Sequence, residues 1–248
     1  MELKSFFKEN PRVALAFSGG VDSAFLLWAA MDAGADVTAY YVKTTFQPEF
    51  ELRDAERLAQ ELNARMVVVE LDVLSDAAIT RNPSDRCYHC KKRIFTAIAE
   101  AARADGYDLL IDGTNASDDA ADRPGMVALR ELSVRSPLRQ CGITKAEVRN
   151  RSREAGLFTW NKPAYACLAT RIPTGEAITA EKLQKTERAE AFLESLGFRD
   201  FRVRLVDGCA KLQLREEQLP LLLEKRRMII NQLKTDYRSV LLDLEVRE

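Results

Sequence analysis

Histidine and long apolar runs are the features that this 248-residue sequence most clearly lacks. A single histidine, His89, cannot supply the ligands of a two-histidine zinc site or the members of a multi-histidine proton relay. No run of about 18 apolar residues occurs, so no transmembrane helix is predicted. Residues 1–10 also lack the apolar core of a signal peptide. We therefore expect a cytoplasmic protein without a membrane partner.

An excess of charge of either sign is also missing. The chain has 37 Lys and Arg against 38 Asp and Glu, a formal net charge of −1. This balance gives no general field to attract nucleic acid, which is therefore not the expected partner, although a local basic stripe would still be possible. Neither a GxxxxGK(S/T) nor a GxGxxG phosphate loop is present. The five cysteines, an odd number, argue against a disulfide framework and leave metal binding, thiol chemistry or burial.

Short apolar runs alternate with helix-length segments through the first two-thirds of the chain. The runs are bounded by Gly, Asn or charged residues, as buried parallel strands are. The predicted strands are Val13–Phe17, Val37–Val42, Met66–Leu71 and Asp108–Ile111. The predicted helices are Ser23–Ala33, Glu49–Asn63, Lys91–Ala104 and one that begins at the capping box Thr144–Glu147 and ends near Gly156. This order predicts an α/β fold with a doubly wound parallel sheet.

The last part of the chain has a different pattern. Amphipathic helices and alternating strands follow one another there in the order αββαβ, and an Asp-Gly pair at 207–208 predicts a hairpin. The predicted elements are Thr179–Leu196, Phe201–Val206, Ala210–Leu214, Leu219–Leu233 and Val240–Val246. A linker around residues 171–176, which contains Pro173 and Gly175, predicts a first domain of residues 1–172 and a smaller α+β domain of residues 173–248.

The strongest motif lies directly between a predicted strand and a predicted helix. It consists of Ser18, Gly19, Gly20, Val21, Asp22 and Ser23. Consecutive glycines let the backbone approach an oxyanion, the helix amino terminus points amides at it, and the serine hydroxyls can donate to further phosphate oxygens. Asp22 is then a candidate magnesium ligand, because phosphates near a carboxylate need a cation between them. The alternative is an ordinary turn whose glycines serve tight packing.

This motif resembles the PP-loop of the ATP pyrophosphatase superfamily, which includes NAD synthetase, GMP synthetase and several tRNA thiolases. The resemblance implies cleavage of ATP between the α and β phosphates. Adenylation of this kind turns a poor oxygen leaving group into a good one: pyrophosphate leaves, and a nucleophile then displaces AMP.

A second polar cluster follows the strand at 108–111. Asp112, Gly113, Thr114 and Asn115 lie at its carboxyl end, where open α/β sheets bind their ligands. The charged run at 118–125 could line the same crevice. A solvated loop is the alternative interpretation.

Three longer segments resemble one family within this superfamily. They read GTNASDDAADRPGMVALREL, VRSPLRQCGITKAEVR and WNKPAYACLATRIPTGEAIT. They are similar to the LarE family, the sulfur transferases that build the nickel-pincer nucleotide cofactor of lactate racemase, and the likeness runs from Ser18 to about Arg204. The resemblance implies adenylation of a pyridinium dicarboxylate mononucleotide and conversion of the activated carboxylate to a thiocarboxylate. It also suggests a homo-oligomer.

Cys167 lies in the third of these segments. The resemblance implies that it takes part in sulfur chemistry, and in one branch of the family the matching cysteine gives up its own sulfur and becomes dehydroalanine. Thr170 and Arg171 match a polar pair of that segment, and the planar guanidinium of Arg171 suits phosphate or carboxylate. A buried structural cysteine is the alternative.

A CxxC pair, Cys87 and Cys90, opens the helix expected near Lys91. It permits a thiol–disulfide pair, a zinc site or an iron–sulfur cluster. The self-sacrificing branch needs only the cysteine that matches Cys167, so the CxxC is a departure from its pattern. We predict that Cys87, Cys90 and Cys167 hold a 4Fe–4S cluster whose open iron binds a sulfide.

Several further residues are weaker candidates. Arg202 and Arg204 alternate on one strand and therefore share a face, either as a phosphate clamp for the mononucleotide or as a solvated surface. Glu190 faces the same pocket in the family, with surface charge as the alternative. Cys141 and Cys209 match no chemistry, and Trp160 suggests packing.

Together these observations predict an ATP- and Mg²⁺-dependent sulfur transferase. A tRNA-thiolating PP-loop enzyme combines the same motifs, but the net charge and the lack of an RNA-binding appendage count against it. An amide-forming synthetase would need no cysteines. A regulator that binds nucleotide or cluster would not release pyrophosphate.

Overall fold

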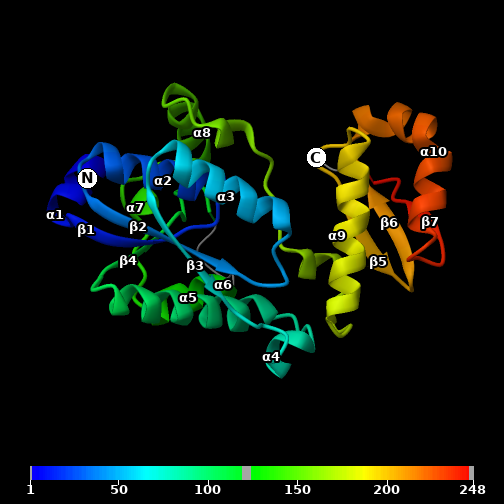
Figure 1. Ribbon diagram of the computed structural model, residues 1–248, viewed down its shortest axis with the longest axis horizontal. Helices are drawn as coiled ribbons and strands as arrows, with labels where there is room; N and C mark the ends of the chain where they lie inside the picture. Colours follow the sequence, from blue (N-terminus) through cyan, green and yellow to red (C-terminus); the bar gives the residue numbers. More distant parts are fainter. Residues whose placement is uncertain (1, 119–123, 246–248) are drawn as a thin grey trace. The chain divides into compact units, whose positions relative to one another are not determined.

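The computed structural model of the chain describes residues 2–118 and 124–245, which form two compact units (Figure 1). The first unit comprises the chain up to Val73 together with Asp85–Lys162, and the second comprises Leu74–Ser84 and Pro163–Glu248. The boundary predicted between residues 172 and 173 therefore falls inside the second unit. Asn82 explains part of this difference, because its amide donates to the carbonyls of Ile172 and Pro173, at 3.3 and 2.7 Å.

A parallel four-stranded sheet forms the centre of the first unit. Its order is β3 (Arg65–Glu70), β2 (Asp36–Lys43), β1 (Arg12–Ala16) and β4 (Leu110–Asp112). The four strands lie within two residues of the predicted runs, because each run is a short, largely apolar segment bounded by polar residues or glycine.

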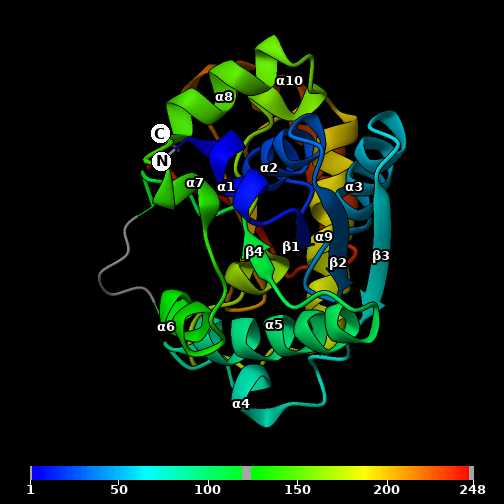
Figure 2. The same ribbon diagram turned by 90° about the vertical axis from the view of Figure 1, so that its left-hand side faces the viewer.

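Helices cover both faces of this sheet, as Figure 2 shows for α2 and α8 on one side and α5 and α6 on the other. Alternate residues of β1 separate the two faces: Val13 and Leu15 pack in one apolar cluster, and Ala14 packs in the other. The helices of the unit are α1 (Leu3–Glu9), α2 (Val21–Asp32), α3 (Glu49–Glu61), α5 (Arg86–Ala104), α6 (Pro124–Glu131), α7 (Pro137–Gln140) and α8 (Lys145–Glu154). This confirms the predicted doubly wound α/β fold.

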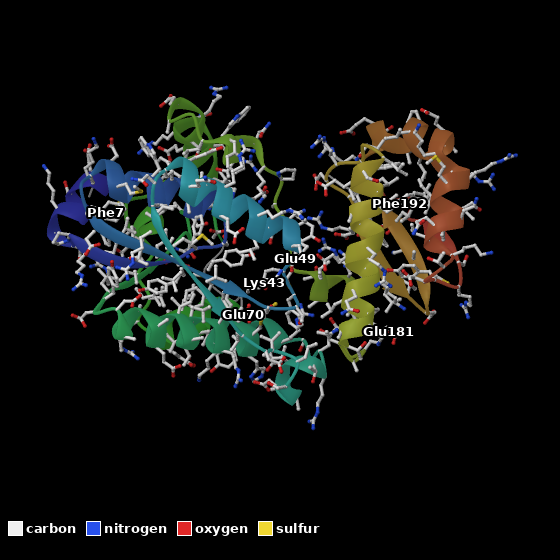
Figure 3. The ribbon with its side chains drawn as sticks, in the orientation of Figure 1. Phe7, Lys43, Glu49, Glu70, Glu181 and Phe192 are labelled. Atoms are coloured by element: carbon white, nitrogen blue, oxygen red, sulfur yellow. The ribbon has the colours of Figure 1, made fainter. Side chains whose placement is uncertain are left out.

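Single side chains illustrate how helices are fixed to the sheet (Figure 3). Phe7 of α1 is buried in the larger cluster. Lys43 at the end of β2 pairs with Glu49 in the first turn of α3. An acidic residue in that turn also complements the positive end of the helix dipole.

The second unit confirms the αββαβ order. Its sheet is β5 (Arg202–Val206), β6 (Cys209–Gln213) and β7 (Val240–Leu242), in which β5 and β6 are antiparallel and β6 and β7 are parallel. Asp207 and Gly208 both have positive φ, 47° and 74°, as the tightest hairpin turn requires. The longer helices α9 (Ala180–Ser195) and α10 (Leu219–Leu233) contribute Leu193 and Ile229 to the apolar core, and α4 (Ala77–Thr80) also belongs to this unit.

The main local difference concerns α5, which begins at Arg86 and not at Lys91. Its first turns carry the polar and cysteine side chains of the CxxC motif, so they lack the apolar period that indicates a helix. Cys87 and Cys90 consequently lie inside the helix. None of the helices in the described parts of the chain is long and apolar enough to cross a membrane.

Candidate functional site

The segment at residues 18–23 connects β1 to α2 and includes the first turn of that helix, so it lies between the strand and the helix as predicted. Gly19 has φ +69°, and a Cβ built there would lie 3.0 Å from Cβ of Ala55 on α3. Both the left-handed backbone and the close approach of α3 therefore require glycine. Gly20 is the N-cap of α2 and has no side chain to cap the first amides, so the positive end of this helix suits an anion.

The two serine hydroxyls stabilise this loop through hydrogen bonds within it. The Oγ atoms of Ser18 and Ser23 lie 3.1 Å apart, and Ser23 Oγ also donates to the carbonyl of Gly20, at 3.2 Å. The amide of Gly20 in turn donates to Ser18 Oγ, at 3.3 Å. The loop is therefore organised around its own hydroxyls.

Asp22 is held by side chains from two other parts of the first unit. The Asn115 amide donates to Oδ1 of Asp22 at 3.1 Å, and Lys145 Nζ donates to Oδ2 in an ion pair. Asn115 is 2% exposed, whereas the Asp22 and Lys145 side chains are 24% and 35% exposed. The structure thus brings the predicted residues Asp22 and Asn115 together and adds Lys145, at the open side of the cluster.

The sequence pattern does not mark Lys145 as a site residue. It is the first residue of α8, directly after the N-cap Thr144, whose predicted capping box with Glu147 is confirmed. Cations are unfavourable at a helix N-terminus, where acidic residues are the usual choice. A lysine at the first position of a helix therefore indicates that a nearby anionic group stabilises its charge.

Gly113 allows the loop after β4 to reach the start of α2. A Cβ built at Gly113 would lie 2.9 Å from the backbone nitrogen of Ser23, so a larger residue would push the two loops apart. The glycine loops after β1 and β4 thus meet at neighbouring strand ends, as predicted for a doubly wound sheet.

The rest of this loop is held by its own polar groups. Asp112 accepts hydrogen bonds from the hydroxyls of Thr114 and Ser136, at 2.5 and 2.6 Å. The carboxylate of Asp118 accepts a hydrogen bond from the backbone N–H of Asn115 at 2.9 Å. Asp118 therefore supports the loop, while residues 119–123 of the charged run named above lie outside the described residues.

Cys87 and Cys90 lie on the first turns of α5, one exposed and one partly exposed. Arg86 Nη2 lies 3.9 Å from Cys87 Sγ. Among the described residues, no group of three or more His, Cys, Asp or Glu is arranged to hold a metal ion. Cys167 belongs to the second unit, so the three-cysteine cluster stays a prediction.

Cys167 is the N-cap of a short 3-10 helix, Leu168–Arg171, in the second unit. Arg171 is 1% exposed and folds back over this segment. It donates to the carbonyl of Ala166 and the hydroxyl of Thr170, both at 2.8 Å, and to Glu190 Oε1 and Oε2 at 2.8 and 3.1 Å. Burial alone lowers the pKa of Arg171, but the hydrogen bonds and charge of Glu190 outweigh it and raise the net pKa.

Glu190 is 7% exposed, so the surface-charge alternative for this residue is wrong. Arg202 is 5% exposed, which likewise excludes a solvated face for it. Arg202 donates to the carbonyl of Ala164, and Arg204 donates to the carbonyl of Thr170, at 2.6 and 2.9 Å. Both arginines thus contact the Cys167 segment, while their role with phosphate stays a prediction.

The three remaining weak candidates are local features. Cys209 is buried, and burial raises the pKa of the Cys141 thiol, which makes that thiol a poorer nucleophile. Trp160 is 38% exposed, and the guanidinium carbon of Arg153 lies 5.7 Å from its ring centroid.

Comparison with known proteins places this architecture in a family. A family model described as queuosine biosynthesis protein QueC matches residues 12–89, the region of the glycine loop. A protein of Lactiplantibacillus plantarum named pyridinium-3,5-bisthiocarboxylic acid mononucleotide synthase is 35% identical over 98% of this chain and 89% of its own length. This chain belongs to the LarE family of sulfur transferases. It is therefore an enzyme of the PP-loop superfamily.

Other relatives extend the LarE comparison. An uncharacterised protein of Synechocystis sp. is 41% identical over 88% of this chain and 81% of its own length. An uncharacterised protein of Methanocaldococcus jannaschii is 30% identical over 98% and 93%. The tRNA-specific 2-thiouridylase MnmA of Frankia alni is 31% identical, but the match covers 61% of this chain and 53% of that enzyme. The match to the bisthiocarboxylic acid mononucleotide synthase thus spans most of both chains, whereas the MnmA match does not.

Proposed function

We propose that this enzyme uses ATP to adenylate a carboxylate of pyridinium-3,5-biscarboxylic acid mononucleotide and then replaces AMP with sulfur. The product is a thiocarboxylate, a step in nickel-pincer nucleotide biosynthesis. The observation that carries the proposal is the match to the bisthiocarboxylic acid mononucleotide synthase over 98% of the chain. The polar cluster around the PP-loop also supports the proposal, because its groups are suited to the phosphates of ATP.

The PP-loop and its neighbours are suited to the phosphates of ATP. The amides at the start of α2 and the hydroxyls of Ser18 and Ser23 would donate to phosphate oxygens. Lys145, within reach of the same loop through Asp22, would add a positive charge. Asp22 offers the carboxylate oxygen that Mg²⁺ prefers, so these residues fit the ion, which when bound would neutralise phosphate charge.

The first step is a substitution at the α phosphorus. A carboxylate oxygen of the mononucleotide forms a bond to this phosphorus, and the bond to the bridging oxygen breaks, so that pyrophosphate leaves with the electron pair. In the second step a sulfide nucleophile bonds to the activated carbonyl carbon and AMP leaves. No net oxidation or reduction occurs, because sulfur enters at the level of sulfide.

We further propose Cys87, Cys90 and Cys167 as the ligands of a 4Fe–4S cluster. The first two thiols are three residues apart on α5, about one helical turn, so they can share a face. When bound by three thiolates, such a cluster has one iron open to carry an external sulfide. The alternative is a single-turnover transferase in which Cys167 gives up its own sulfur.

A product assay tests the proposal as a whole. The enzyme is incubated with ATP, Mg²⁺, sulfide and the dicarboxylate mononucleotide, and the products are identified by mass spectrometry. We expect AMP, pyrophosphate and a thiocarboxylate, and no ATP turnover with a pyridinium mononucleotide that lacks carboxylates. ADP and phosphate as products would overturn the proposal.

The MnmA matches favour tRNA thiolation as a second candidate. The same assay with tRNA in place of the mononucleotide separates the two. Thiolated tRNA without thiocarboxylate formation would favour this second function, against which the net charge of −1 counts.

Replacing Lys145 is expected to slow pyrophosphate release. Lys145→Met removes the charge beside Asp22 and should lower the rate by about 100-fold, the lower end of the range for a lost electrostatic contact to a reacting phosphate. Lys145→Arg retains the charge and should recover part of the rate. Thr144→Ala is the matched control, because it weakens the cap of the same helix by about 1 kcal/mol without removing the cation. If Thr144→Ala and Lys145→Met lower the rate equally, the positive charge of Lys145 is not required.

We also propose a homo-oligomer. The second unit exposes several large apolar side chains, namely Leu223, Met228, Leu241, Leu242 and Leu244. A second copy of the chain that covered them would remove this apolar surface from water. Sedimentation at micromolar concentration should show a species larger than a monomer, and Leu241→Glu should shift it toward the monomer. A wild-type chain that sediments only as a monomer contradicts the proposal.

A further inference from the structure

Tyr165 lies two residues before Cys167 and joins the charged groups that surround this segment. Residues 162–167 form no helix or strand, and Tyr165 is partly buried while Ala164 and Ala166 are exposed. The guanidinium carbons of Arg171 and Arg202 lie 4.6 and 5.1 Å from the centroid of its ring. The ring is therefore within cation–π distance of two buried arginines.

The hydroxyl of Tyr165 connects the same residue to α9. It donates to Oε2 of Glu190 at 2.6 Å. Glu190 also accepts two hydrogen bonds from the guanidinium group of Arg171. It accepts a further one from the backbone N–H of Val203 on β5, at 2.9 Å. The carboxylate of Glu190 thus connects the Cys167 segment, α9 and β5. Tyr165 contacts the two arginines through its ring and Glu190 through its hydroxyl.

The main chain of the segment depends on the same arginines. Arg202 donates to the carbonyl of Ala164, and Arg171 donates to the carbonyl of Ala166. A segment without regular structure has no ladder to hold its carbonyls, so these contacts set its path. The Tyr165 ring lies against both guanidinium groups and favours the orientation from which they reach these carbonyls.

We propose that Tyr165 is the positioning residue that fixes Cys167 for sulfur transfer. It acts through Arg171, Arg202 and Glu190, and it does not itself touch the reacting atoms. The inference rests on the proposed function, because it takes Cys167 as part of the sulfur site. A displacement of a reacting group by about 1 Å can cost about 100-fold in rate, so loss of this support is expected to be visible.

The test compares the two half-reactions in three variants. Tyr165→Leu removes the ring and the hydroxyl and should lower thiocarboxylate formation by about 10- to 100-fold, while the rate of pyrophosphate release at saturating ATP and mononucleotide stays unchanged. Tyr165→Phe keeps the ring and should recover most of the transfer rate. Tyr237→Leu is the matched control: Tyr237 is a buried tyrosine of the same unit with Lys185 over its ring, and its loss should lower stability without changing the ratio of the two rates.

Two readouts do not depend on activity. The amide of Thr170 donates to the carbonyl of Cys167 at 3.0 Å, so its hydrogen exchange reports the fold of the segment. Tyr165→Phe, which loses one hydrogen bond to a carboxylate, should speed this exchange by about tenfold, and Tyr165→Leu should speed it further. Alkylation of Cys167 by iodoacetamide, followed on its peptide by mass spectrometry, should accelerate in the same order.

The outcomes separate this inference from the function on which it rests. If Tyr165→Phe leaves the Thr170 exchange rate unchanged, the positioning role is overturned, and this holds even if Tyr165→Leu does not fold. An unchanged ratio of transfer to pyrophosphate release in Tyr165→Leu overturns it as well. If Cys167→Ser still transfers sulfur, the role of Cys167 fails, whereas the exchange measurements on Tyr165 still decide whether it holds the segment.

Discussion

Asp22→Ala is expected to abolish pyrophosphate release while the fold is retained. Asp22 accepts from Asn115 and Lys145 and is proposed as the Mg²⁺ ligand, so its removal takes away the cation and the anchor of two neighbouring side chains. Loss of one electrostatic group at a reacting phosphate costs about 100- to 1,000-fold, and the loss of an ion as well places the effect at the upper end. A coupled assay for pyrophosphate measures it directly.

Asp32→Ala is the matched control for this change. Asp32 ends the same helix and pairs with Lys4 at the surface, at 2.9 Å, so its removal alters the net charge equally and leaves the loop intact. The control should retain full turnover, and both variants should unfold at similar temperatures, because Asp22 is a partly exposed residue of the first turn of α2 and not part of the apolar core. Full pyrophosphate release by Asp22→Ala would remove this residue from the site.

Loss of iron and of sulfur transfer is the second large effect, expected in each of Cys87→Ala, Cys90→Ala and Cys167→Ala. The wild-type chain, purified without oxygen and supplied with iron and sulfide, should be brown and carry about four irons per chain. Three ligands leave no spare thiolate, so each single substitution should remove the cluster. Adenylation should persist in all three variants, because none of these cysteines belongs to the PP-loop at residues 18–23. Pyrophosphate and thiocarboxylate are measured in the same reaction.

Cys141→Ala and Cys209→Ala are the controls and should keep both iron and transfer, since neither thiol is a proposed ligand. Two results contradict the cluster. A colourless protein that contains zinc would identify the CxxC as part of a zinc site. An iron-free protein whose Cys167 becomes lighter by one H₂S after a single turnover would identify it as the sulfur donor itself.

The parts of the site that could be predicted from sequence are those encoded locally. Ser18–Ser23 is a contiguous motif between a strand and a helix, and the structure places it there. Asn115 was predictable because carboxyl ends of parallel strands share one edge. Lys145 was not predictable, because no residue near it in the sequence indicates that it pairs with Asp22. The capping box formed by Thr144 and Glu147 already accounts for the polar residues at the start of α8.

The arginines of the second unit show a different limit. Alternation along β5 correctly places Arg202 and Arg204 on one face, but it does not state what that face meets. Their partners are backbone carbonyls of residues 164 and 170, and every residue has such a group, so no pattern of side chains marks them. Burial of Glu190 was equally hidden, because a glutamate in an amphipathic helix is usually solvated.

The two side chains that hold Asp22 come from far along the chain. Asn115 is 93 residues away and Lys145 is 123 residues away. A growing polypeptide therefore has the whole glycine loop long before it has the groups that orient its aspartate. Nucleotide binding becomes a property of the finished first unit, and a bound nucleotide adds its binding free energy to that state alone. In the cell, ATP would then act for this enzyme as a folding ligand as well as a substrate, favouring chains whose synthesis has passed α8.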